Sequence, residues 1–523
     1  MKTLKCIKGF IGTEISAVDY LSNRVLTNEA ETYKFYKRMK NKFGTTVSLV
    51  ADYVPINKFK KRYHYPTDRL ELLLPIINAN GYKIDVKVKK PVNGKPLDLN
   101  MLSDKEPRDY QEPVIDKITG MVQGDRTLVC LPTGTGKTFS SCYALQKRGN
   151  KFLVYVLARY VDKWVSDIKE MFDIEDDELY VIVGKKKFDN LFALDKNAKA
   201  EKDSVDKVLA LDKQTTDKIK VYVCSNRTMF TYIKDYMNTP DETKFTITPN
   251  NFLEYTGVDT VLIDEAHQEF ENIFRTMVVL NPSILVGLSA TFYPSDKEQG
   301  KMYDMLFPRT NYVGNIKVDP YVDTWAISYT LTDKDIKHTG NFGYSHVEFE
   351  KAIFRNKRML KNYTDMVINV LNKLYMEDYR DGDKALLYFS TIDMVKHMQE
   401  AIMSVYKDTG DRYGRPFDVS TYISGDPYET IGDSDVIVST LGKSSTALDI
   451  PNLTTVIMTV ILNSESMNHQ AFGRLRDLKE GREKFAFLYA NNLSKHRHNA
   501  FSKIEMLNAR MKDLHKIPYR GKI

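Results

Sequence analysis

The residues best suited to chemistry lie in two short segments of the chain, and the first of these is 131–138. Its sequence, Leu-Pro-Thr-Gly-Thr-Gly-Lys-Thr, combines two glycines with a lysine and hydroxyl groups. In such a loop the backbone N–H groups face phosphates, Lys137 reaches the outer phosphates, and the Thr138 hydroxyl holds Mg²⁺. The usual pattern begins with glycine where this chain has Leu131, so an ordinary glycine turn is the alternative. The predicted ATP-binding residues of this segment are Pro132, Thr133, Gly134, Thr135, Gly136, Lys137 and Thr138.

The second segment is Asp264-Glu265-Ala266-His267, which follows an apolar run. Both carboxylates are therefore expected at the carboxyl end of a buried strand. There Asp264 would bind Mg²⁺, and Glu265 would orient or deprotonate the attacking water. Two acids at a strand end are also common in solvated turns, but together with Lys137 they favour ATP hydrolysis.

Alternating strand and helix patterns surround both segments. The apolar runs that predict a first parallel sheet are 127–131, 152–157, 221–224 and 260–263. A helix is predicted over 139–148, and the runs 384–389 and 435–440 predict a second parallel sheet. A basic helix is predicted over 494–516. The predicted fold class is α/β, with two tandem parallel-sheet domains and a small basic N-terminal domain.

Three further segments accompany the first two. They are Arg108-Asp109-Tyr110-Gln111, Ser289-Ala290-Thr291 and Gln470-Ala471-Phe472-Gly473-Arg474. In order and spacing, the five segments resemble the superfamily-two DEAH-type helicases, which have two RecA-like motor domains. The chain most resembles the UvsW-type phage DNA helicases and a related poxvirus transcript-release helicase. The resemblance runs from Arg108 to about Tyr489 through scattered motifs.

The resemblance implies roles for residues of the first half. Tyr110 and Gln111 would contact adenine. His267, Ser289 and Thr291 would couple the nucleotide site to nucleic acid. Without the other motifs, a plain helix start at residue 110 and an ordinary strand-to-loop transition at residue 289 are the alternatives.

In the second half, the resemblance points to four residues of the ATP site. Asp449 is an expected ATP contact within a segment similar to the family's Ser-Thr-Gly-x-Asp-x-Pro element, with Ala447 where glycine is usual. Gln470, Arg474 and Arg476 are predicted catalytic residues. Arg474 is the preferred arginine finger, because Arg476 lies one position before the family's second arginine. An arginine finger acts only when the two domains close. The alternative is that both arginines lie on the outside of an amphipathic helix.

The predicted domains are 1–105, a small basic nucleic-acid-binding domain; 106–315, a first RecA-like ATPase domain; and 316–523, a second RecA-like helicase domain. The segment 185–220 is rich in Lys, Asp and Ala and is expected to be a charged insertion in the first motor domain.

Positive charge is concentrated at the N-terminus. The first 100 residues contain 19 Lys and Arg against 9 Asp and Glu, a net charge of +10, whereas the whole chain carries +7. Basic residues interleaved with aromatic ones, including Tyr63 and Tyr65, suit phosphate neutralisation with base stacking. The alternative is a solubilising surface with core aromatics. The predicted nucleic-acid contacts are Lys37, Arg38, Lys60, Lys61 and Arg62, with Arg159, Arg227 and Thr440 at strand ends.

The cysteine spacing and the apolar runs of the sequence argue against several classes of protein. The four cysteines have no metal-ligand spacing, which argues against a zinc ribbon or an iron-sulfur cluster. No apolar run approaches the ~20 residues of a membrane span, and no signal peptide is recognisable at the start. The expected location is the cytoplasm, or the host cytoplasm for a viral protein. A monomer is expected, because two motor domains complete one ATP site.

The sequence therefore predicts an ATP-dependent DNA helicase or translocase that uses Mg²⁺ with ATP. It would act on duplex, branched or single-stranded DNA in replication, recombination or repair, and RNA–DNA hybrids are a further possible partner. One alternative is an RNA-directed or transcript-release ATPase. An alternative of another class is a nucleotide-gated DNA clamp or remodelling subunit that separates no strands.

Overall fold

The computed structural model describes residues 2–523 except for 42–43, 103–105, 132–134, 185–212, 243–244, 246, 290–296, 315–319, 334, 341–342, 408–416, 424–425, 427–430, 433, 445–449 and 479. For residues 37–41, 44–46, 48, 50, 213–215, 297–298, 443–444 and 466, it describes the backbone alone. The chain divides into two compact units, one of residues 1–131 and 136–316 and the other of residues 317–523, with which Thr135 is grouped.

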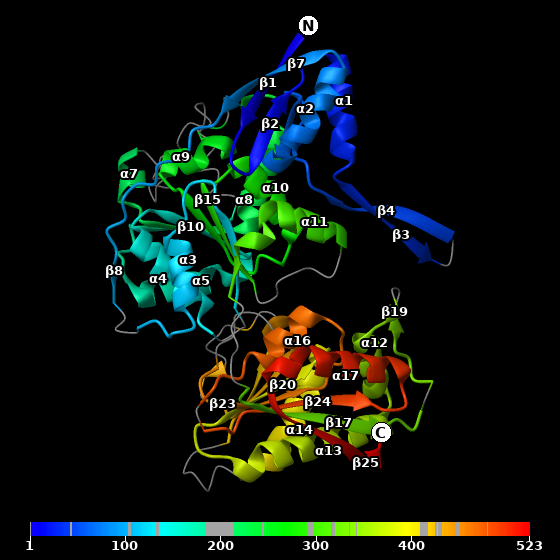
Figure 1. Ribbon diagram of the computed structural model, residues 1–523. Coiled ribbons are helices and arrows are strands. Elements are labelled where there is room, and N and C mark those ends of the chain that lie inside the picture. The colour runs from blue at the N-terminus through cyan, green and yellow to red at the C-terminus, as the bar shows by residue number, and fades with distance from the viewer. Residues whose placement is uncertain are drawn as a thin grey trace, which may run out of the picture. The chain divides into compact units, whose positions relative to one another are not determined.

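A five-stranded sheet with two helices forms the N-terminal part of the first unit (Figure 1). Its strand order is β5-β6-β2-β1-β7. In β1 the side chains of Leu4 and Cys6 are buried while Lys5 and Ile7 are exposed, so one face of the sheet is covered. The elements are β1 (Lys2–Lys8), β2 (Gly12–Ser16), α1 (Tyr20–Glu31), β5 (Ile56–Asn57), β6 (Arg62–Pro66), α2 (Leu70–Ala79) and β7 (Tyr82–Val88). A separate ribbon of β3 (Lys34–Asn41) and β4 (Gly44–Asp52) extends away from the sheet (Figure 1).

The N-terminal sheet packs closely on the first parallel sheet's helices. The backbone N–H groups of Ile11 and Gly12 donate to Oδ1 of Asn281 over 2.7 and 3.2 Å. A Cβ at Gly12 would lie 1.8 Å from the carbonyl oxygen of Val278, so no larger residue fits there. Residues from both parts share one hydrophobic core.

The first parallel sheet has seven strands in the order β12-β13-β10-β14-β15-β9-β16. Strands β10, β13, β14 and β15 are buried at every position, as expected for parallel strands covered on both faces. The strands are β9 (Arg126–Cys130), β10 (Phe152–Val156), β12 (Leu179–Ile182), β13 (Val221–Ser225), β14 (Thr260–Ile263), β15 (Ile284–Ser289) and β16 (Tyr312–Val313). A short antiparallel pair, β8 (Asn100–Met101) and β11 (Phe172–Asp173), lies apart from it. The helices are α3 (Glu112–Thr119), α4 (Lys137–Arg148), α5 (Val161–Met171), α7 (Lys213–Lys218), α8 (Asn226–Met237), α9 (Phe252–Thr256), α10 (Phe270–Leu280) and α11 (Lys297–Leu306).

The second unit repeats this architecture with the strand order β21-β22-β20-β23-β24-β17-β25 (Figure 1). In β20, Leu387 and Phe389 face a core formed with α12–α14, whereas Leu386 and Tyr388 face a core formed with α16 and α17. Helices therefore cover both faces. The strands are β17 (Val322–Thr330), β20 (Lys384–Phe389), β21 (Val419–Tyr422), β22 (Val436–Thr440), β23 (Leu453–Met458), β24 (Lys484–Ala490) and β25 (Met511–Lys522), with a small pair β18 (Thr339–Gly340) and β19 (Gly343–Tyr344). The helices are α12 (His346–Arg355), α13 (Lys357–Leu374), α14 (Ile392–Tyr406), α15 (Leu441–Ser444), α16 (Glu465–Phe472) and α17 (Ser494–Leu507).

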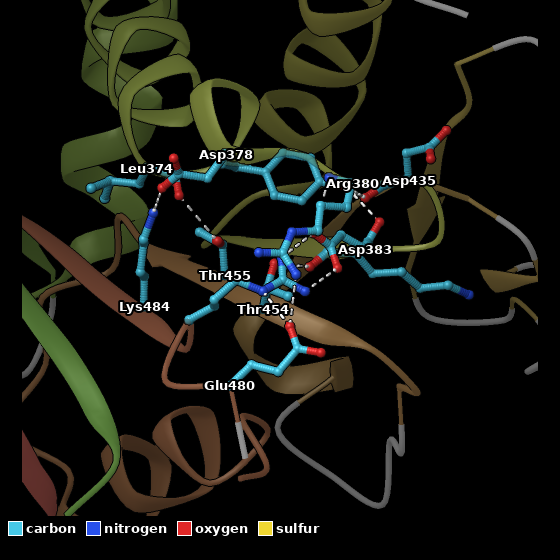
Figure 2. Close-up of polar contacts among 12 residues, drawn as sticks. Leu374, Asp378, Arg380, Asp383, Asp435, Thr454, Thr455, Glu480 and Lys484 are labelled. Atoms are coloured by element: carbon cyan, nitrogen blue, oxygen red, sulfur yellow. Dashed lines mark hydrogen bonds and ion pairs between the residues drawn. The ribbon is translucent and has the colours of Figure 1, made fainter. Parts of the chain in front are cut away.

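Ion pairs join the loops at the amino edge of this second sheet (Figure 2). Both Nη atoms of Arg482 donate to the carboxylate of Asp383, over 2.6 and 3.1 Å. Glu480 accepts from Nε of Arg482 and from Arg380 over 2.8 and 3.0 Å. Because these residues precede β20 and β24, the network holds the edge of the sheet that is opposite to the predicted site residue Thr440.

The predicted fold class, with two tandem parallel sheets, is confirmed. The prediction of a helix over 494–516 is wrong in its second part, since α17 ends at Leu507 and Met511–Lys522 pairs with β17. Only Met511 is fully buried in this edge strand. Its polar sequence therefore lacks the apolar run that marks a central strand. The charged insertion lies mostly outside the described residues.

Candidate nucleotide site and nucleic-acid surface

The predicted site residues of the first unit follow strands that share one edge. The neighbours β13, β10, β14, β15 and β9 are parallel, so their carboxyl ends meet at the same edge of the sheet. In that order, these strands lead to or end in Arg227, Arg159, Asp264, Ser289 and the loop before Lys137. The topology thus brings together segments separated by more than a hundred residues.

Lys137 is the first residue of α4. Its Nζ atom is buried and has no hydrogen-bond partner among the described residues. A buried ammonium group without a partner is costly unless an anion binds to it. A phosphate group would fill this role, and the N–H groups at the start of α4 would add to its stabilisation.

Gly136 and Gln111 are in direct contact. Gly136 precedes α4 with a φ of +82°, in the left-handed region that favours glycine. A Cβ at this position would lie 2.5 Å from Nε2 of Gln111. Gln111 is only 4% exposed, and its Oε1 accepts from the backbone N–H of Arg108 over 3.0 Å. Tyr110 lies beside it and accepts from Nη1 of Arg108 over 3.1 Å. The structure therefore joins the Arg108–Gln111 segment to the predicted phosphate-binding loop, of which residues 132–134 lie outside the described part.

Two N–H groups hold the carboxylate of Asp264. The indole N–H of Trp164 donates to Oδ2 over 2.8 Å, and the backbone N–H of Glu265 donates to Oδ1 over 2.9 Å. Burial raises the pKa of Asp264, and the neighbouring carboxylate of Glu265 adds to the increase. The bond from Trp164 and the charge of Lys137 act in the opposite direction, toward the ionised form.

Glu265 and His267 lie together at the end of β14. Glu265 adopts a φ of 49°, an uncommon conformation for a residue with a side chain. Its Oε2 atom is 3.4 Å from Nδ1 of His267, which is also 3.1 Å from Oγ of Ser289. Burial lowers the pKa of His267 to about 4, and Lys137 contributes in the same direction. The imidazole is therefore neutral at physiological pH, and its contact with Glu265 is not an ion pair.

The donor set fits a magnesium ion that arrives with a nucleotide. Thr138 and Asp264 offer oxygen atoms, which Mg²⁺ prefers, and the ion usually needs only one or two protein ligands besides phosphates and water. Within the described residues, no group of three or more His, Cys, Asp and Glu side chains could hold a metal ion. Thr138 and Asp264 therefore suit a magnesium ion whose other ligands are the phosphates of a bound nucleotide and water.

Residues 104–294 match the family described as the res subunit of type III restriction enzymes. This span contains Gln111, Lys137, Asp264 and Ser289. Over these residues the chain carries a domain that is similar to helicase-type ATPases. Domains of this class use ATP and act on nucleic acid, so the predicted resemblance is confirmed at this level. No protein of curated function matches the sequence.

Solved helicase structures also resemble the chain. The helicase domain of Hef from Pyrococcus furiosus is 13% identical, covers 75% of this chain and 97% of its own, and has a TM-score of 0.41. Mss116p, solved with single-stranded RNA and AMP-PNP, is 14% identical, with coverages of 79% and 74% and a TM-score of 0.49. UvsW of T4 is 15% identical, with coverages of 99% and 100% and a TM-score of 0.29.

Two predicted nucleic-acid contacts, Arg159 and Arg227, lie at the same carboxyl edge of the first parallel sheet. Nη2 of Arg159 donates to Oε1 of Gln268 over 2.5 Å, and the backbone N–H of Gln268 donates to the carbonyl of Glu265 over 2.7 Å. Arg159 is thus linked to the acidic segment through one side chain. Arg227 is exposed at the start of α8. Thr291 lies outside the described residues.

Sequence reasoning missed Trp164. This residue is 2% exposed in α5 and reaches Asp264 across 100 positions of sequence. In the sequence, a single tryptophan in an amphipathic helix is interpreted as a core residue. Its helix reaches the acidic segment through the pairing of β10 with β14, which the sequence does not reveal. A buried indole N–H that needs an acceptor is the one signal the sequence offers.

In the second unit, the predicted residues occupy α16 and the positions after it. Gln470 is buried, Arg474 is half-buried and Arg476 is exposed. Thr440 is the last residue of β22, at the carboxyl edge of its sheet. Asp449 lies outside the described residues.

The predicted basic contacts of the N-terminal part have different environments. Lys37 and Arg38 are in β3, where only the backbone is described. Lys60 and Lys61 are exposed. Arg62 is paired with Glu242 over 2.7 Å.

A search of the helices in the described part of the chain finds none with the length and apolar character of a membrane span.

The aromatic residues expected to stack beside these basic groups are buried. Tyr63 is 3% exposed and Tyr65 is 0% exposed, and their rings lie 6.1 Å apart in the core of the N-terminal sheet. Neither ring is available to an external base, because β6 turns this face inward against α1. The expectation of base stacking by these two residues is therefore wrong.

Proposed function

We propose that the protein is an ATP-dependent DNA helicase or translocase that acts on branched or duplex DNA in replication, recombination or repair. The observation that carries the proposal is the buried Nζ of Lys137, which has no hydrogen-bond partner among the described residues and lies at the same sheet edge as Asp264 and Glu265. A cation placed to bind a phosphate, beside one carboxylate for Mg²⁺ and another for water, is the arrangement that phosphoryl transfer to water requires.

Each residue has a separate task in this proposal. Lys137 binds the outer phosphates, and Thr138 and Asp264 hold Mg²⁺. When bound, the ion would neutralise charge on the phosphates as it develops. Gln111, supported by Tyr110, recognises the adenine edge. The contact between Gln111 and Gly136 supports a single site that includes both segments.

Glu265 is the proposed general base. Its Oε2 atom accepts no hydrogen bond in the described structure. The neighbouring His267 is neutral because burial lowers its pKa to about 4, so it does not neutralise the carboxylate. Glu265 can therefore accept a proton from, or orient, the water that attacks the γ-phosphate. The proposed role of Ser289 is to hold His267 through their 3.1 Å contact.

The second unit is proposed to complete the cycle. On the basis of the motif, Arg474 acts as the arginine finger, with Arg476, Gln470 and Asp449 contributing to the same ATP site. Arg159, Arg227 and Thr440 are the proposed contacts with nucleic acid near the strand ends. The bond from Arg159 to Gln268 supports a route by which binding of nucleic acid alters the acidic segment.

A strand-separation assay tests this proposal. Labelled forked DNA, blunt duplex DNA and an RNA–DNA hybrid are each incubated with ATP and Mg²⁺, with Lys137→Ala as the blank. Release of a strand from forked DNA is the expected result. Release from the hybrid alone would favour a transcript-release enzyme. ATP turnover without separation or movement on any substrate would favour a nucleotide-gated clamp.

A further inference from the structure

The loop between β5 and β6 presents an aromatic ring to solvent. Strand pairing of Asn57 with Arg62 leaves four residues, Lys58 to Lys61, outside the sheet. All four are exposed, and the ring-bearing residue Phe59 is 58% exposed. The loop thus combines three lysines with one phenyl ring.

Hydrogen bonds at both ends hold this loop in one conformation. Oδ1 of Asn57 accepts from the backbone N–H of Lys60 over 3.0 Å, and its amide donates to the carbonyl of Tyr236 over 3.4 Å. Lys61 has a φ of 51°, and its carbonyl accepts from the N–H of Ala17 over 3.0 Å. A loop fixed in this way loses little entropy when it binds a partner.

The charge of the loop is available for binding. None of Lys58, Lys60 and Lys61 forms an ion pair within the described part of the chain. Arg62, in contrast, lies 2.7 Å from Glu242 and 3.7 Å from Glu14. Arg62, at the start of β6, therefore fixes the end of the loop through Glu242 and Glu14, and the three lysines carry the loop's positive charge.

Phe59 has no evident role in the fold. Its ring is mostly exposed, whereas the core on this side is filled by Tyr63 and Tyr65. Exposing an aromatic ring to water forgoes the stabilisation that burial of a large apolar side chain contributes. A ring held beside ammonium groups matches an unpaired base with its flanking phosphates, because every base has a face that can stack.

We propose that residues 58–61 bind single-stranded nucleic acid, with Phe59 stacked on an unpaired base and the lysines near its phosphates. Stacking on Phe59 is open to every base, so we expect binding to tolerate any sequence. Bases inside a duplex have no free face, so an unpaired strand is preferred. This inference rests on the proposed function only in requiring that the protein binds nucleic acid.

Fluorescence anisotropy with labelled oligo-dT, oligo-U and a blunt-ended, two-stranded DNA duplex tests the site at several salt concentrations. Phe59→Ala should weaken binding to the single strands by about 5- to 150-fold, the range for loss of one stacked base. Its salt slope should stay unchanged, and Phe59→Tyr should retain affinity. Lys60→Gln should reduce the slope by about 0.7, the value for one phosphate contact on a single strand.

Two controls separate this site from other causes. Phe501→Ala removes a ring that is 62% exposed in α17 of the second unit, and it should leave affinity unchanged. Phe59→Ala should keep the parental rate of ATP hydrolysis without nucleic acid. Equal binding of Phe59→Ala and the parent to single strands would overturn the inference alone, as would an equal loss of affinity on the duplex. Absence of nucleic-acid binding by the parent would overturn the proposed function as well.

Discussion

Trp164 donates its indole N–H to Oδ2 of Asp264 over 2.8 Å, while Oδ1 accepts from the backbone of Glu265. Both oxygens are thus held, and the plane of the carboxylate is fixed by donors from two elements, α5 and the turn after β14. A hydrogen bond to a charged group contributes about 1.5–3 kcal/mol. Trp164 is therefore a positioning residue for the proposed magnesium ligand.

Replacement of Trp164 by Phe should raise the Mg²⁺ concentration that gives half-maximal ATP hydrolysis by about tenfold, because an aromatic ring is kept but the N–H donor is lost. Steady-state hydrolysis as a function of Mg²⁺ measures this shift. Trp325→Phe, which changes a residue stacked on His515 in the second unit, is the matched control. An unchanged magnesium dependence in Trp164→Phe would contradict the positioning role.

Fluorescence offers a readout that does not depend on turnover. The chain has two tryptophans, so Trp325→Phe leaves Trp164 as the only one. Its emission should change when Mg²⁺ and a non-hydrolysable ATP analogue bind, because the indole contacts Asp264. Adding the Asp264→Asn change should remove the magnesium-dependent part of the signal, and persistence of that part would argue against Asp264 as a ligand.

The buried His267 should make stability depend on pH. Its pKa is lowered to about 4 in the folded protein, against about 6.5 in the unfolded chain. Between these values the unfolded state binds more protons, so stability falls as the pH decreases from 6.5 toward 4. Between pH 7 and pH 5, the parent should lose about 2 kcal/mol more than His267→Asn. Chemical unfolding at both pH values measures this, and identical losses would contradict the assignment.

Gly136→Ala should weaken ATP binding and reduce stability by about 1–2 kcal/mol, since its backbone is left-handed. The new methyl group would also meet Gln111 Nε2 at 2.5 Å. In a Gln111→Ala background, Gly136→Ala should reduce stability by a smaller amount, because the new methyl group no longer meets the side chain of Gln111. Thermal unfolding of the parent, the two single variants and the double variant measures the coupling energy between positions 136 and 111. If the effects of the two substitutions on stability simply add, the contact contributes nothing to stability.

The sequence allowed much of the fold and the nucleotide site to be predicted, because apolar runs mark buried parallel strands and the motif residues follow them directly. Strand 260–263 agrees with β14 at both ends. Contacts between distant segments were not predictable in this way. Trp164 and Asp264 meet only through sheet order, and the polar edge strand β25 has the composition of a basic helix.

Burial within the N-terminal part was also hidden from the sequence. Basic and aromatic residues are mixed from Lys58 to Tyr65, yet Tyr63 and Tyr65 turn inward, Arg62 pairs with Glu242, and Phe59 remains outside. The shared core with α10 has a practical consequence. Deleting the first hundred residues would expose apolar surface on the helicase-type domain, so substitutions at single positions are the sounder test of nucleic-acid binding.

Phosphate release measured with and without DNA tests the central claim most directly. Parent, Lys137→Ala and Glu265→Gln are compared with no nucleic acid, single-stranded DNA and forked DNA, together with binding of a fluorescent ATP analogue. We predict hydrolysis stimulated by DNA in the parent, loss of nucleotide binding or turnover in Lys137→Ala, and retained binding with turnover reduced by about 100-fold or more in Glu265→Gln. Hydrolysis at the parental rate in either variant would contradict the account.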